Sequence, residues 1–200
     1  ELRGSLYVVA LDESNFSTFS TFYAKMLLQI GSEVDVVAKF YCSLLNSTSA
    51  PWGIRDYQKI ICSNEKDFPV QKVELLNTNI VLEPWSSWQT KDIPDWWDHY
   101  NKVKHHRTET REIDGEVVRV IELGSIKNAL KSLAALFQLL VSSYKMLCSH
   151  DDPTMTPLPG SRLFKMSGTM WNGINFYPSD YVFYIEGGHI IQQSASFPYD

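Results

Sequence analysis

The sequence contains few cysteines and no long uncharged apolar segment. Its three cysteines, Cys42, Cys62 and Cys148, are far apart and form no CxxC pair or Cys/His zinc spacing. This spacing argues against a disulfide framework and predicts reduced thiols, as in a cytoplasmic protein. No run of about 18 apolar residues lacks charges, so the sequence predicts no membrane span.

The chain also lacks the common sequence motifs of catalysis and cofactor binding. It contains no GxGxxG, GxxxxGK[ST], GxSxG or HExxH segment, so we expect no nucleotide cofactor and no serine-hydrolase site. His105 and His106 are adjacent and would point about 100° apart on a helix, which argues against a shared metal ion. We therefore expect neither a cofactor nor a transition-metal site.

Composition predicts a globular chain with a true core. The 200 residues are 44% hydrophobic and 13% aromatic, and the formal net charge is −5. A negative net charge argues against general attraction to nucleic acids, although a local basic patch remains compatible with it.

Hydrophobic periodicity predicts a mainly α protein, with a helical bundle of about four or five helices at residues 1–150. We expect β-hairpin insertions in the bundle and a β-rich C-terminal appendage, residues 151–200, packed on it. The predicted helices are Phe19–Leu45, Ile54–Cys62, a third that Pro94 opens, and Ile126–Leu147. The predicted extended segments are Val70–Leu82, Thr108–Ile113, Glu116–Leu123, Gly173–Tyr177, Tyr181–Ile185 and His189–Ser194.

Two dipeptides predict tight turns between strands. Asp114-Gly115 separates two strand-like segments, and this pair favours a two-residue hairpin with positive φ at Gly115. Gly187-Gly188 gives the same indication near the C-terminus.

Glu33 is the most unusual acid in the first predicted helix. At about 100° per residue it points within the apolar stripe, flanked by Phe22, Met26 and Phe40. A buried carboxylate needs a partner, and we expect one between Asn101 and Arg107, within hydrogen-bond reach. Glu33 is then either a structural tie between helices or a carboxylate of a functional site.

A basic cluster follows at the end of the third predicted helix. Asn101, Lys104, His105, His106 and Arg107 lie within seven residues. Cations are stabilised at a helix C-terminus, so the cluster has a purely structural interpretation. It also combines histidine proton shuttles with fixed positive charge, which phosphodiester cleavage requires.

Three segments together resemble a known superfamily. They are Ser32-Glu33-Val34-Asp35-Val36-Val37-Ala38-Lys39, then Trp97 with Asn101-Lys102-Val103-Lys104-His105-His106-Arg107, then Asn128-Ala129-Leu130 with Leu133-Ala134-Ala135-Leu136. Over residues 15–147 the chain resembles uncharacterised bacterial proteins related to the HEPN superfamily, helical bundles of toxin–antitoxin, abortive-infection and other phage-defence systems.

The resemblance implies a function and a mode of assembly. Active members of the superfamily are metal-independent ribonucleases that act as dimers and carry an arginine, then four to six residues, then a histidine. No arginine here precedes a histidine at that spacing, although Lys145 and His150 have it. We therefore expect a defence-type or stress-type cytoplasmic homodimer that binds or cleaves RNA. The expected catalytic residues are His105, His106, Arg107, Lys104, Glu33 and Asn101.

A second hypothesis belongs to another functional class. In it the protein is a non-catalytic interaction module for a cognate partner protein, and the Glu33/Lys-His-His-Arg cluster only holds helices together. Exposure of His105 and Arg107 in a cleft favours the first hypothesis, and burial of the whole cluster favours the second.

Overall fold

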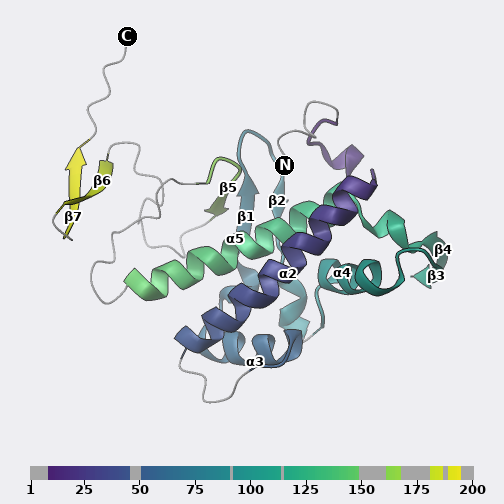
Figure 1. Cartoon of the computed structure of the whole chain (residues 1–200), viewed down its shortest axis with the longest axis horizontal. Coiled ribbons are helices and arrows are strands. Elements are labelled where there is room, and N and C mark those ends of the chain that lie inside the picture. The colour runs from purple at the N-terminus through teal and green to yellow at the C-terminus, as the bar shows by residue number, and fades with distance from the viewer. Residues whose placement is uncertain are drawn as a thin grey trace, which may run out of the picture.

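The protein is mainly helical, with small antiparallel sheets (Figure 1). The structure is a computed structural model and describes residues 9–45, 51–90, 92–113, 115–148, 161–167, 181–186 and 189–194. These residues form four α-helices, α2 (Thr21–Leu44), α3 (Ile54–Asn64), α4 (Asp95–His106) and α5 (Ile126–Cys148), with several short 3-10 turns. The predicted fold class, mainly α with β-hairpins, is confirmed, and each predicted helix is present.

Helix α2 begins and ends close to its predicted limits, and Ser20 caps its first turn. The Ser20 hydroxyl accepts a hydrogen bond from Tyr23 N at 3.1 Å, which satisfies one free amide of the first turn. The buried face of α2 includes several small residues, Ala24, Gly31 and Ala38, among its larger apolar ones. These small residues let other elements approach the α2 backbone closely.

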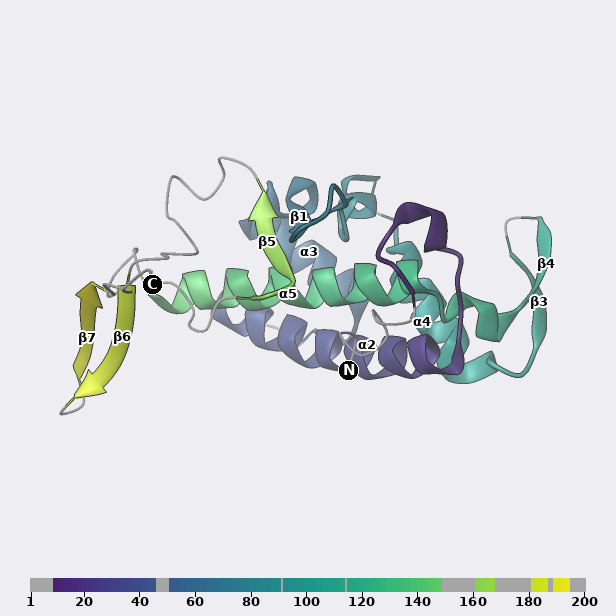
Figure 2. The ribbon, with the colours of Figure 1, turned by 90° about the horizontal axis from the view of Figure 1, so that it is seen from above.

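Helices α2 and α5 lie side by side and run in the same direction (Figures 1 and 2). Backbone hydrogen bonds tie their starts together: Ser20 N donates to Gly124 O at 3.1 Å, and Ile126 N donates to Thr18 O at 2.9 Å. Phe19 and Ser125 form an isolated antiparallel bridge at the same place. These bonds, which we call the backbone clasp, hold the starts of the two helices together.

Three small sheets complete the described fold. The first has the order β2-β1-β5 and is antiparallel throughout, and the others are two-stranded hairpins. The first sheet contains β1 (Lys72–Leu75), β2 (Val81–Leu82) and β5 (Phe164–Ser167), and the hairpins are β3 (Thr110–Ile113) with β4 (Glu116–Arg119), and β6 (Tyr181–Glu186) with β7 (His189–Ser194). Strand β5 brings part of the C-terminal region into the body of the protein, because Phe164 packs on Phe137 of α5.

The predicted hairpins form with the expected registers. Ile113 pairs with Glu116, so the connection has two residues, and Gly115 has φ of 84°. Glu186 pairs with His189 in the C-terminal hairpin. Asp114, Gly187 and Gly188, and the predicted strand 173–177, lie outside the described residues.

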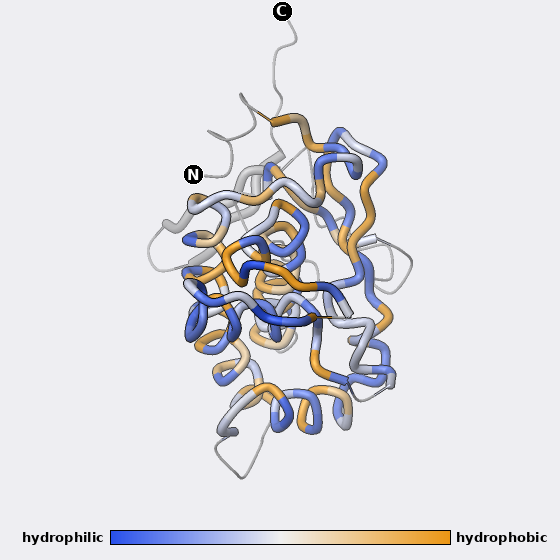
Figure 3. Tube along the Cα trace, turned by 90° about the vertical axis from the view of Figure 1, so that its right-hand side faces the viewer, coloured by the Kyte–Doolittle hydropathy of each residue, from blue (hydrophilic) through white to orange (hydrophobic). Residues whose placement is uncertain are grey.

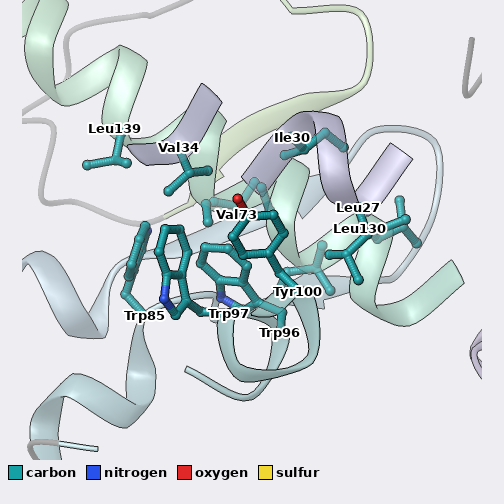
Figure 4. Close-up of a cluster of buried hydrophobic side chains, with 14 of the residues drawn as sticks. Leu27, Ile30, Val34, Val73, Trp85, Trp96, Trp97, Tyr100, Leu130 and Leu139 are labelled. Carbon is teal, nitrogen blue, oxygen red and sulfur yellow. The ribbon is translucent and has the colours of Figure 1, made fainter. Parts of the chain in front are cut away.

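A continuous set of aromatic rings fills the core beside α4 (Figure 4). Trp85 contacts Trp88 and Trp96 with ring centroids 4.3 and 5.2 Å apart, and Trp97 packs next against Tyr100 at 5.2 Å. The Trp96 indole N–H donates to Pro84 O at 2.8 Å, so this buried ring has its polar atom satisfied. These four tryptophans are core residues, whereas Trp52 is 92% exposed.

The apolar and polar sides of the helices are visible in the hydropathy of the chain (Figure 3). Along the helical coils the colour alternates between orange and blue, because each helix turns one side to the core. Across the residues that the structure describes, none of the helices combines the length and the apolar character that crossing a membrane requires.

The close approach of α4 to α2 generates a prediction about Gly31. A Cβ added there would lie 2.4 Å from Tyr100 Cδ2, and the Tyr100 ring is buried. Glycine to alanine inside an exposed helix normally stabilises by about 1 kcal/mol. Here we expect Gly31→Ala to lower the free energy of unfolding by about 1–3 kcal/mol, the usual cost of overpacking. Urea denaturation monitored by circular dichroism measures the change.

A double-mutant cycle gives the control for this prediction. In a Tyr100→Leu background the same glycine substitution should cost much less, because the ring that it strikes is gone. Equal costs in both backgrounds would show that Tyr100 does not limit the space at Gly31.

Candidate functional site

The basic cluster at the end of α4 is on the surface. Lys104, His105 and Arg107 are exposed, and His106 and Asn101 are half-buried. Acidic Asp95 and Asp98 lie in the first turn of α4 and the basic residues in its last turn, so the charges complement the helix dipole at both ends. The cluster is therefore accessible to a ligand.

The prediction for Glu33 is wrong. Glu33 is exposed on α2, and no hydrogen bond or ion pair joins it to residues 101–107 in the described part of the chain. The prediction relied on Phe22, Met26 and Phe40; Met26 is buried, but Phe40 is itself 46% exposed. The buried face of α2 centres instead on Leu27, Val34 and the small residues at which neighbouring elements approach. Glu33 thus lies outside the cluster.

Asn101 and Lys102 have partners on α4 itself. Asn101 Nδ2 donates to Trp97 O at 3.1 Å, and Lys102 Nζ pairs with Asp98 Oδ2 at 2.6 Å. Both contacts follow the i,i+4 geometry of a helix and contribute modestly to its stability. Neither residue is directed into the site by these bonds, so their role is to support the helix.

The two histidines of the cluster differ in their surroundings. His106 Nδ1 lies 2.8 Å from Glu109 Oε1, and Arg111 reaches the other oxygen of that carboxylate at 2.8 Å. The hydrogen bonds from His106 and Arg111 lower the pKa of the Glu109 carboxyl. The His105 ring lies 6.2 Å from that of His106, centroid to centroid, and makes no hydrogen bond within the described residues. One imidazole is thus oriented by a carboxylate and the other is open to a ligand.

A cleft of about 370 Å³ lies beside Arg107, where the end of α4 meets the start of α2. Its polar side chains are Arg107, Thr108, Thr21 and Lys25, and its floor is formed by apolar groups of Ala24, Leu28 and Ile121. The cleft exists because α4 packs on α2 through Tyr100 and Gly31, which brings the helix end over the first turns of α2. It is the most direct candidate for a binding site at the cluster.

The two cations of the cleft have no anionic partner among the residues that the structure describes. Among the described residues, neither Arg107 nor Lys25 makes a hydrogen bond or an ion pair, whereas most other charged side chains near α4 are paired. Lys104 is held only by the Tyr100 hydroxyl at 3.3 Å and by its position 5.4 Å from the centre of that ring. The cleft therefore presents uncompensated positive charge, which suits an anionic ligand.

Sequence reasoning did not identify Lys25, nor the contact between His99 of α4 and Asn128 of α5. Lys25 carries no sequence signal of function, because only the folding of α2 beneath the end of α4 brings it to Arg107. His99 Nδ1 lies 2.9 Å from Asn128 Nδ2, and the same amide donates to Leu123 O at 2.8 Å. With Lys131 bound to Asp95 at 2.7 Å, these contacts fix α4 on α5.

The charge pattern of the site supports anion binding better than metal binding. Within the residues that the structure describes, no three His, Cys, Asp or Glu side chains gather closely enough to hold an ion. Charge-assisted hydrogen bonds from a guanidinium and an ammonium are instead the usual means of binding phosphate.

The carboxylate between His106 and Arg111 generates a prediction. We expect the Glu109 carboxyl to titrate below its ordinary pKa, and His106→Gln and Arg111→Gln to raise that pKa separately. Because the folded-state pKa is lowered, the associated stabilisation is present above the ordinary pKa and is lost as the pH falls through the lowered one. Carbon-detected NMR titration of the side-chain carboxyl measures the shift, with exposed Glu112 as the control. A Glu109 pKa unaffected by both substitutions would contradict the described geometry.

Comparison with known proteins gave no match for this chain. No family model matches the chain, and neither the curated proteins nor the solved structures include a significant match.

Proposed function

We propose that the protein binds RNA through the cleft between the end of α4 and the start of α2. One observation carries this proposal: Arg107 and Lys25 line the same cleft and have no anionic partner among the described residues. In a chain whose net charge is −5, this local concentration of exposed, unpaired cations favours an anionic ligand.

The rest of the cleft fits a nucleotide unit better than an isolated anion. Phosphate oxygens accept hydrogen bonds from Arg107, Lys25 and the hydroxyls of Thr21 and Thr108. The apolar floor offers a surface for a sugar or an unstacked base, which single-stranded RNA can present. Lys104 and His105, both exposed on the last turn of α4, extend the positive surface along the strand.

The same cluster has the groups for RNA cleavage without metal. In such a reaction the ribose 2′-hydroxyl attacks the adjacent phosphorus, one imidazole removes its proton, and an acid protonates the departing 5′-oxygen. His105 and His106, with ring centroids 6.2 Å apart, lie immediately before Arg107, whose charge would stabilise the transition state. Such a reaction accords with the HEPN-like, phage-defence role that the resemblance implies.

The second hypothesis, a non-catalytic interaction module, is supported by the contacts of Asn101, Lys102 and His106. Each of these side chains has an intramolecular partner. Arg107, Lys25 and His105 do not share this property, so the described geometry favours a ligand-binding role. In a homodimer the second protomer would contribute a second basic cluster. Light scattering coupled to size-exclusion chromatography determines whether the homodimer forms.

RNA binding is tested by removing one cleft charge at a time. We expect Arg107→Gln and Lys25→Gln each to weaken binding of a fluorescein-labelled 12-nucleotide RNA about tenfold or more, since a charge-assisted hydrogen bond contributes about 1.5–3 kcal/mol. Each substitution should also make the plot of log affinity against log salt concentration shallower, by about 0.7 for every phosphate that the protein no longer neutralises. Fluorescence anisotropy at several salt concentrations gives both quantities.

The matched control is Lys66→Gln, which removes the same charge from an exposed residue beyond the end of α3. It should leave affinity nearly unchanged. An equal loss in the control and the cleft variants would show nonspecific attraction, and unchanged affinity in the cleft variants would refute the proposed binding site.

Cleavage is tested separately, in EDTA, with wild type beside His105→Ala and His106→Ala. Because general acid–base transfer contributes about 10²–10⁴-fold, loss of the true shuttle should remove nearly all turnover while binding persists. Both residues lie on the surface end of α4, so circular dichroism should show unchanged folding. RNA binding without wild-type cleavage would restrict the function to binding, and equal cleavage by all three proteins would place the chemistry elsewhere.

A further inference from the structure

A second polar groove lies on another part of the molecule, between α3 and the 3-10 turn η3 (Ser86–Thr90). Its volume is about 460 Å³, within the range of small-molecule sites. The groove is lined by Arg55, Gln58, Lys59, Cys62, Ser63, Trp88 and Gln89, none of which belongs to the cleft at the end of α4.

The groove exposes the polar face of α3. Arg55, Gln58, Lys59 and Cys62 follow one another at the three-and-four spacing of a single helix face. The opposite face contains the core residues Ile54, Tyr57 and Ile61. Gln58 Nε2 reaches Trp88 O at 3.4 Å, a weak bond that joins the two walls.

The cations on this face are not compensated. Arg55 makes no ion pair or hydrogen bond within the described residues, and Lys59 Nζ lies only at 3.9 Å from Asp56 Oδ1. The two cations are four residues apart, an arrangement of like charges that destabilises a helix slightly. Arg55 also lies in the first turn, where the helix dipole disfavours positive charge. An anion in the groove would relieve both repulsions.

Trp88 adds a hydrogen-bond donor and an apolar wall. Its side chain is 3% exposed, and its ring packs against Trp85 and Phe68 at 4.3 and 5.9 Å between centroids. The indole N–H makes no hydrogen bond in the described part of the chain, and unlike the Trp85 indole nitrogen it is not fully buried, so it is open to an acceptor at the groove. A ligand oxygen in the groove would supply one.

We propose that the α3–η3 groove binds a small organic oxyanion, a carboxylate or phosphate attached to an apolar body. Arg55 and Lys59 bind the anionic group, and Gln58, Gln89 and Ser63 offer further hydrogen bonds. The apolar body lies against Trp88 and Cys62. Two cations, neutral donors and one aromatic wall in one groove are the elements from which such sites are built.

Cys62 supplies an internal reporter of occupancy. Burial raises the pKa of its thiol, so it reacts slowly but remains half-exposed in the groove. Cys42 is buried, and burial raises its pKa to about 11. A bound ligand should slow alkylation of Cys62 by N-ethylmaleimide, which peptide mass spectrometry follows at this site alone.

The binding test uses phenyl phosphate, benzoate, inorganic phosphate and phenol as probes in isothermal titration and NMR. We expect saturable binding of phenyl phosphate or benzoate, with the preferred one distinguishing phosphate from carboxylate. Inorganic phosphate and phenol, each with one half of the ligand chemistry, should bind at least fivefold more weakly. Saturation should slow Cys62 alkylation at least threefold.

Variants locate the site and separate it from the α4 cleft. Arg55→Gln should weaken binding of the preferred probe at least fivefold without lowering the melting temperature, whereas Arg107→Gln and Lys66→Gln should have no effect on binding. Absence of saturable binding by both organic anions, or a loss with Arg107→Gln in place of Arg55→Gln, would overturn the proposal. Neither probe binding nor Cys62 alkylation depends on RNA binding, so the two proposed sites are tested independently.

Discussion

The close approach of neighbouring elements to α2 is the constraint on which the rest of the structure depends. Tyr100 of α4 lies over Gly31, and the backbone at Gly124, before α5, lies against Ala24. At both places the absence of a larger side chain lets one element approach the backbone of another. The position of α4 fixes in turn where the Lys104–Arg107 segment emerges, so the basic cleft is a consequence of packing in the core.

This constraint explains which features could be predicted from the sequence. The limits of the helices follow from local signals, including Pro94 before α4, Ser125 before α5 and Asp114-Gly115 at the hairpin, and each of these elements is present. Local signals depend on neighbours in the chain, so they persist whatever the tertiary arrangement.

The position of Glu33, in contrast, depended on how the helices pack, which local signals do not reveal. Hydrophobicity alone placed it beside large apolar residues, but helix packing selected the side of α2 that carries glycine and alanine. Small residues have little weight in a hydrophobic pattern, yet they decide where helices approach closely. Lys25 was missed for the same reason, since its proximity to Arg107 exists only after α4 is docked.

The clasp between residues 16–20 and 124–127 has a consequence for how the chain folds. Its main-chain bonds, including Lys127 N to Phe16 O at 3.2 Å, join segments that are far apart in sequence. Helices α3 and α4 and the β3–β4 ribbon are local structures, whereas the clasp closes a loop that contains all of them. Loop closure costs entropy before its contacts form, and nonlocal pairing slows folding. We therefore expect the starts of α2 and α5 to join late in folding, after the intervening helices have formed.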